Sequence, residues 1–184
     1  MRYEFLDKPD FSMVKVTFDQ PGEKMIVESA AMVARSAAMT METNMRGGLM
    51  AAAKRKLLGG ESIFQNTFTA SQPAETLYFA PAPEGDVEVL ELDGSYPVMM
   101  SSGAFLGSAP SVNLDTKWGG AKGFFSGTGM FLLKAEGTGP VFFCCYGGLH
   151  AVDVGPAGYI CDTSHVVAFT GGLNYNVQKL GGLK

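Results

Sequence analysis

The sequence is short of charge and contains no long hydrophobic run. Charged residues make up 17% of its 184 residues, against the roughly 25% of an average globular protein, and the formal net charge is −4. An acidic balance argues against a broad nucleic-acid-binding face, so we expect no DNA partner. No apolar run approaches the ~18 residues of a membrane span, and the first residues lack the apolar core of a signal peptide. The sequence therefore predicts a cytoplasmic protein without a transmembrane segment.

Cysteine and histidine are also scarce, with three and two residues. Cys144 and Cys145 are adjacent, and neighbours on a strand point to opposite faces, so a disulfide framework is not expected. We expect these two residues and Cys161 to be buried, reduced thiols. His150 and His165 are the only histidines, no Cys-x-x-Cys spacing occurs and the carboxylates are not clustered. The sequence therefore predicts no metal and no other cofactor.

Glycine and internal repetition are what the chain has in abundance. There are 24 glycines, and residues 25–50 align without a gap on residues 98–123 and on residues 159–184. Such a repeat indicates one supersecondary unit that is used several times. We predict a single all-β unit over residues 1–184, built of repeated antiparallel β-sandwich or jelly-roll-like units with internal pseudo-symmetry.

Each copy of the repeat contains the same series of elements. A short apolar strand leads through a polar corner to a second apolar strand, and then to a strand with the period-two alternation of a half-buried surface and a glycine pair. The first strands are expected at 25–27, 98–100 and 159–161, the second at 31–34, 104–106 and 166–169, and the alternating strands at 39–45, 112–118 and 173–179. The segments between the copies also correspond: 60–64 with 127–131, 76–79 with 140–143, and 87–92 with 149–154.

Two features depart from this repeat. Residues 49–58 (LMAAAKRKLL) are strong helix formers that end at a glycine pair, which predicts one short helix. The third copy ends at residue 184, where the other copies continue into a glycine–Phe hairpin, so we expect a C-terminal hairpin after 184 to be missing. The strand near residues 14–18 would then be exposed or covered by a neighbouring subunit, because open edges are normally protected.

The polar corner of the third copy holds the main candidates for chemistry. Asp162 and His165 are three residues apart with Ser164 between them, but a catalytic triad requires the base to reach the nucleophile from elsewhere. Ala31 and Ala104 stand in place of the histidine in the other copies, so we interpret the corner as a turn in which Asp and Ser bond to local backbone. Asp162 and His165 remain candidates for an enzyme or small-molecule site.

Lys54, Arg55 and Lys56 form the one basic cluster. The solvated face of a short helix accounts for it, and an RNA-binding patch is the alternative. Methionines concentrate in the first copy, where adaptable side chains suit a core or a subunit interface. Together with the low charge, this favours a homo-oligomer.

Several motifs in combination resemble one family. They are GGESIFQNTFTA at 59–70, ELDG at 91–94, GAFL at 103–106, DTSHVVAF at 162–169 and VQKLGGLK at 177–184. The chain resembles the bacterial and archaeal family related to the altered-inheritance-of-mitochondria proteins of mitochondrial biogenesis. That resemblance implies a fold similar to the tryptophan RNA-binding attenuation protein, a homo-oligomer in the form of a trimer, and no established reaction. We therefore expect a non-catalytic oligomeric scaffold or binding module. The alternatives are a small-molecule-binding protein or enzyme that uses Asp162 and His165, and an RNA-binding or membrane-organising partner protein.

Overall fold

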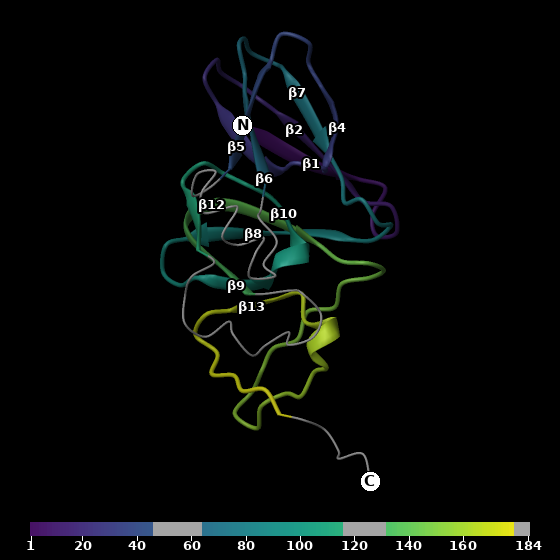
Figure 1. Ribbon diagram of the computed structural model, residues 1–184, viewed down its shortest axis with the longest axis vertical. Helices are drawn as coiled ribbons and strands as arrows, with labels where there is room; N and C mark the ends of the chain where they lie inside the picture. Colours follow the sequence, from purple (N-terminus) through teal and green to yellow (C-terminus); the bar gives the residue numbers. More distant parts are fainter. Residues whose placement is uncertain (46–63, 116–131, 179–184) are drawn as a thin grey trace.

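The computed structural model describes residues 1–45, 64–115 and 132–178. Within these ranges the protein is all-β, with antiparallel strands and two single-turn 3-10 helices, η1 (Ser102–Ala104) and η3 (Thr163–His165). The helix predicted over residues 49–58 lies outside the described residues, so it stays a prediction. Figure 1 shows an elongated molecule in which the N-terminal strands occupy one end and the C-terminal segment the other.

The first sheet has four strands in the order β1-β2-β7-β4. They are β1 (Arg2–Leu6), β2 (Met13–Thr17), β7 (Thr76–Phe79) and β4 (Met32–Arg35). The expectation that the strand near residues 14–18 is exposed or covered by a neighbouring subunit is wrong, because Val14, Val16 and Phe18 are fully buried within the chain itself. β2 lies between β1 and β7, and its alternate side chains point into the core.

The second sheet follows the order β13-β9-β12-β10-β3-β6-β5, with β8 and β11 also paired to β12. The strands in chain order are β3 (Lys24–Glu28), β5 (Thr40–Met45), β6 (Phe64–Thr69), β8 (Val87–Asp93), β9 (Val98–Ser101), β10 (Phe105–Ser108), β11 (Val112–Asp115), β12 (Leu132–Cys144) and β13 (Ala168–Thr170). β12 is the longest and joins two regions: its first half pairs with β9 and β11, and its second half pairs with β8 and β10.

Two hydrophobic clusters hold these strands together. The first combines side chains of both sheets, including Val16 of β2, Val27 of β3, Leu77 of β7 and Phe142 of β12. The Phe142 ring meets the Phe79 ring edge to face at a centroid distance of 5.3 Å, a favoured aromatic geometry. The second cluster lies around β9, β10, β11 and β12. Burial of both clusters supplies the main driving force for this fold.

The third copy of the repeat is built differently from the other two. Strands β3 and β9 lie where the sequence predicts them, and β13 overlaps the end of the second strand predicted at 166–169. The strands predicted at 149–154 and 159–161 are wrong, because these residues form no strand. The strand predicted at 173–179 is wrong over its described residues 173–178, and residue 179 lies outside the described residues. An apolar alternating pattern becomes a strand only where a neighbouring strand receives its hydrogen bonds. In the described structure no strand pairs with residues 149–154 or 159–161.

Candidate functional site

The predicted polar pair lies on the one-turn helix η3. Asp162 caps this helix: its Oδ1 accepts a hydrogen bond from the Ser164 backbone N–H at 2.9 Å and from Ser164 Oγ at 2.6 Å. These bonds hold the pKa of the Asp162 carboxyl below its usual range, with a smaller contribution from the charge of His165. His165 donates its backbone N–H to the Asp162 carbonyl at 3.0 Å. The local geometry is therefore that of a capped turn, with both side chains exposed.

Within the described residues the Ser164 hydroxyl is committed to Asp162, and no hydrogen bond joins it to the imidazole of His165. His150, the second histidine, is exposed in the segment after β12. No group of three or more His, Cys, Asp or Glu side chains is placed to hold a metal ion in the part of the chain that the structure describes. The basic cluster Lys54, Arg55 and Lys56 lies outside the described residues.

The three cysteines differ in their surroundings. Cys144 is buried at the end of β12, where desolvation raises the pKa of its thiol to about 12, with smaller contributions from Cys145 and Glu28. Cys145 is half-buried, and desolvation raises its pKa as well. Cys161 is exposed, so the expectation of three buried thiols is wrong for this residue. Cys161 follows the unpaired segment 159–160, which has no sheet to cover it.

A buried polar cluster that the sequence did not indicate joins the loop after β1 to the start of β8. Asp86 Oδ1 accepts hydrogen bonds from Ser12 Oγ at 3.1 Å and from the Val87 backbone N–H at 2.8 Å. Lys8 pairs with both Asp86 and Glu88. Ser12 is 1% exposed and Asp86 is 7% exposed, so these hydrogen bonds offset the cost of burying both polar groups. These contacts tie the two sheets together.

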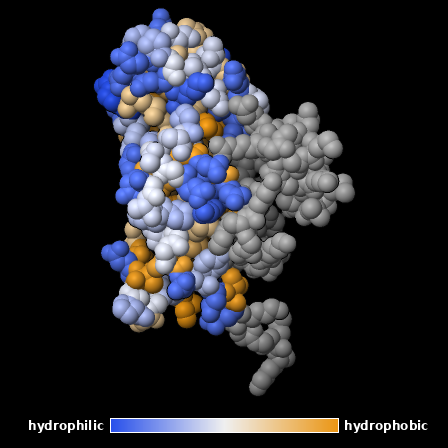
Figure 2. All heavy atoms as spheres, turned by 90° about the vertical axis from the view of Figure 1, so that its left-hand side faces the viewer, coloured by the Kyte–Doolittle hydropathy of each residue, from blue (hydrophilic) through white to orange (hydrophobic). Residues whose placement is uncertain are grey.

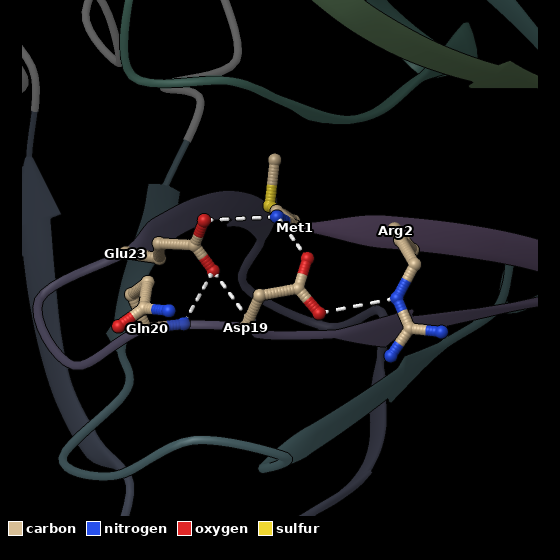
Figure 3. Close-up of polar contacts among 5 residues, drawn as sticks. All are labelled: Met1, Arg2, Asp19, Gln20 and Glu23. Atoms are coloured by element: carbon tan, nitrogen blue, oxygen red, sulfur yellow. Dashed lines mark hydrogen bonds and ion pairs between the residues drawn. The ribbon is translucent and has the colours of Figure 1, made fainter.

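A second polar cluster surrounds the N-terminal ammonium (Figure 3). The Met1 nitrogen pairs with Asp19 Oδ2 at 2.7 Å and with Glu23 Oε1 at 2.8 Å. Arg2 adds a contact to the other Asp19 oxygen at 3.1 Å, and Gln20 donates its backbone N–H to Glu23 Oε2. The cluster fastens the start of β1 to the turn between β2 and β3.

A small cavity of about 180 Å³ lies where the first and second copies meet. Its wall combines Glu28 of β3 with Phe105 and Leu106 of β10 and Cys144 of β12. Glu28 Oε2 accepts the Ala30 backbone N–H at 2.9 Å, so this carboxylate also serves a local turn. The cavity is therefore a largely apolar recess at the polar corner of the first copy.

Exposed apolar side chains at unpaired strand edges are the most distinctive surface feature. β4 is the edge strand of the first sheet, and its Val33 side chain is 56% exposed. Tyr159 and Ile160 are 64% and 71% exposed in the segment before η3. On the face drawn in Figure 2, hydrophobic side chains gather at the lower end of the molecule, where the C-terminal segment lies, whereas the upper end is mainly hydrophilic. An open apolar edge is a template for pairing with another strand.

Sequence reasoning placed these edge residues in strands but could not identify them as a surface. Val33 and Ile160 are as apolar as the buried Val27. They are exposed because no described strand covers them, whereas Val27 lies on a strand that is paired on both sides. The sequence feature that could have identified them is the repeat, because it predicts which copy supplies the partner of each strand. No helix of the described residues is long and apolar enough to span a membrane.

Comparison with known proteins places this geometry among relatives. The family model described as "Mitochondrial biogenesis AIM24" matches residues 3–184. An uncharacterised protein of Streptococcus pyogenes is 26% identical over 186 residues, an alignment that covers 97% of this chain and 74% of the relative. The X-ray crystal structure of protein SPYM3_0169 from Streptococcus pyogenes is similar with a TM-score of 0.76 and 25% identity, over 98% of this chain and 81% of that chain.

Proposed function

The chain belongs to the mitochondrial biogenesis AIM24 family, and on that premise we propose that it is a non-catalytic scaffold or binding module that assembles with copies of itself. The observation that carries the proposal is the open edge of β4 together with the exposed apolar segment 159–160. Soluble proteins normally blunt such edges with charge, proline or a covering element. A second protein chain is the covering element that this composition favours.

The finer architecture belongs to the same proposal. We propose that the strands form repeated sandwich-like units similar to the tryptophan RNA-binding attenuation protein, with internal pseudo-symmetry, and that three chains form a cytoplasmic homo-trimer. The packing of the first hydrophobic cluster between two antiparallel sheets supports sandwich-like units. The low charged fraction of 17% supports a surface that is partly covered in an oligomer.

Light scattering coupled to size-exclusion chromatography tests self-assembly directly. We expect the purified protein at micromolar concentration to have a mass three times that of the 19.5 kDa chain. The mass should be stable over a tenfold dilution, since interfaces built from paired strands and apolar contacts dissociate weakly at these concentrations. A 19.5 kDa monomer throughout this range would overturn the proposal.

A second candidate function is small-molecule binding near η3. It is favoured by one observation, the exposure of both Asp162 and His165 on the same turn. A thermal-shift screen of metabolites on the wild type and on His165→Ala tests it. Stabilisation that the variant loses would support this candidate, and a wild type that no compound stabilises would count against it.

A further inference from the structure

In the first two copies of the repeat, the first strand pairs with the strand that follows that copy, and the register is the same in both. In the first copy Met25 of β3 faces Phe68 of β6, and in the second copy Val98 of β9 faces Ala135 of β12. Residue 25 corresponds to residue 98 in the aligned copies. The correspondence of 60–64 with 127–131, continued along the chain, makes residue 68 the equivalent of residue 135. The hairpin that follows each copy therefore covers the same side of its first strand.

The opposite side of each first strand is covered by the next copy. Val27 of β3 faces Gly107 of β10, which is the second strand of the second copy. Met100 of β9 faces Ala168 of β13, which is the second strand of the third copy. Residues 27 and 100 are equivalent, and so are residues 107 and 168. The second strand of each copy thus pairs with the first strand of the copy before it.

In the described residues this pattern leaves one edge of β4 and the segment 159–161 without the strand that it predicts for them. β4 is the second strand of the first copy, and β7 is its only neighbour. Residues 159–161 correspond to the first strand of the third copy, and no described strand pairs with them. Figure 1 places β4 near the upper end of the molecule and the coil of η3, directly after residue 161, near the lower end. One chain as folded cannot bring these two elements together.

We propose that β4 pairs antiparallel with residues 159–161 of a second copy of this chain, an assignment that rests on the self-assembly proposed above. The equivalences set the register: Ala34 opposite Cys161, Arg35 opposite Ile160, and Ser36 opposite Tyr159. This contact joins two different surfaces, so it is heterologous and generates a closed ring or an open filament. A trimer assembled through it is a head-to-tail ring.

The residue at position 34 supports this occupant. Its equivalents are Gly107 and Ala168, so the position that faces the preceding first strand is small in every copy. At Gly107 a Cβ would lie 3.0 Å from the Ile26 carbonyl oxygen, which shows how closely that strand approaches. Ala168 shows that an alanine also fits opposite a first strand, and Ala34 lies at the equivalent position on an edge that no described strand occupies.

The expected geometry allows a cross-linking test with the native Cys161. In the pairing of β13 with β9, Ser101 N–H donates to the Val167 carbonyl at 2.9 Å and Gly171 N–H to the Pro97 carbonyl at 2.7 Å. Met100 and Ala168 are the residues next to the hydrogen-bonded pair Ser101 and Val167, so they form a non-hydrogen-bonded pair. The Cα atoms of such pairs lie about 4.5 Å apart. That separation lies within the range of about 4.4–6.8 Å found for disulfides.

In a Cys145→Ser background, Ala34→Cys should therefore form an intermolecular disulfide with Cys161 under mild oxidation. A non-reducing gel should show dimers and higher bands that disappear in the Ala34→Cys/Cys161→Ser variant. Val33→Cys is the matched control, because its side chain is exposed and residue 33 lies one position off the expected pair, at the register shift of β4. It should cross-link at least about tenfold more slowly.

A second pair of variants tests the contact without oxidation. Ile160→Lys places a charge in the proposed strand pair, whereas Val152→Lys changes a side chain that is also exposed, at 40%, but outside it. Both residues are exposed in the single chain, so neither change disturbs its core. Light scattering should give a monomeric Ile160→Lys and a Val152→Lys with the wild-type mass.

Each contrary outcome has a definite meaning. An oligomeric wild type whose Ala34→Cys variant forms no disulfide, or forms it no faster than Val33→Cys, overturns this strand pairing and leaves self-assembly standing. A disulfide within one chain, seen as a shifted monomer band, overturns the assignment to a second copy. Full wild-type mass in Ile160→Lys also overturns it. A monomeric wild type removes both proposals together.

Discussion

At the N-terminus a single ammonium group joins two carboxylates that lie on the turn between β2 and β3. Hydrogen bonds to Asp19, and then to Glu23, raise the pKa of the Met1 ammonium above its ordinary value of 8.0. The hydrogen bonds from the same ammonium are the main reason why the pKa values of Asp19 and Glu23 lie below their ordinary values of 3.8 and 4.5. The three groups therefore stabilise the folded chain only while all of them are charged.

The sign of this effect predicts a pH dependence. The carboxylate contributions are complete above the unfolded pKa values of 3.8 and 4.5 and are lost as the pH falls through the lowered folded values. The ammonium contribution is complete below its unfolded pKa of 8.0 and is lost as the pH rises through the raised folded value. Glu23→Gln should therefore be less stable than the wild type between about pH 5 and pH 8, and the two should converge on either side of this window.

Urea unfolding at pH 3, 6.5 and 10.5 measures this difference. Glu84→Gln is the matched control, because Glu84 is exposed and its substitution removes the same charge at a site away from the cluster. A Glu23→Gln deficit that does not change with pH would show that the carboxylate acts by shape alone.

At the scale of elements, β12 determines how the two core regions are connected. Gly137 and Gly139 have φ values of 128° and 107°, which only glycine adopts readily, at the point where β12 passes from β11 to β8. A Cβ at position 137 would lie 2.2 Å from the Ser111 carbonyl oxygen. The glycines are therefore required both by backbone conformation and by the close approach of the neighbouring loop.

Gly137→Ala should lower the free energy of unfolding by about 2 kcal/mol or more, since backbone strain and overlap with Ser111 add together. Gly148→Ala should change it by less than about 0.5 kcal/mol, because an added Cβ there meets no atom within 4 Å. Chemical denaturation of both variants checks the contrast. Equal stability of the two variants would contradict the backbone assignment of β12.

Elements also mark the limit of sequence-based prediction. The strands at 25–27 and 98–100 could be predicted because their apolar runs are short and bounded by polar corners, and they became β3 and β9. The equally apolar run at 159–161 did not become a strand. Local pattern describes both alike, and only the presence of a partner distinguishes them.

At the scale of the whole molecule, Phe142 connects the two sheets. Its fully buried ring extends from β12 and contacts the ring of Tyr3 of β1 at 5.1 Å and that of Phe79 of β7 at 5.3 Å. Phe142→Ala should therefore lower the free energy of unfolding by about 3–5 kcal/mol, the usual cost of truncating a buried phenylalanine. Phe11→Ala is the control, because Phe11 is 69% exposed and should cost less than about 0.5 kcal/mol.

Thermal and urea unfolding of both variants provide the measurement. If Phe142→Ala destabilises only one region, its unfolding curve should show two separated transitions. That result would also identify the Phe142 ring as the contact that makes the two sheets unfold together. A Phe142→Ala variant as stable as Phe11→Ala would contradict the packing of the first hydrophobic cluster.

The sequence by itself determined the all-β class, the strands of the first two copies, the polar corners and the family, because these depend on residue type, local period and turn chemistry. It also contained a candidate pair, Asp162 and His165, but not its environment. Only the tertiary structure decided that β2 is buried and that Cys161 is exposed. It also decided that, among the described residues, one edge of β4 is open and residues 159–161 are unpaired at the opposite end of the molecule. Strand pairing joins residues far apart in the chain, so whether an apolar strand becomes core or open edge is settled by its neighbours in space.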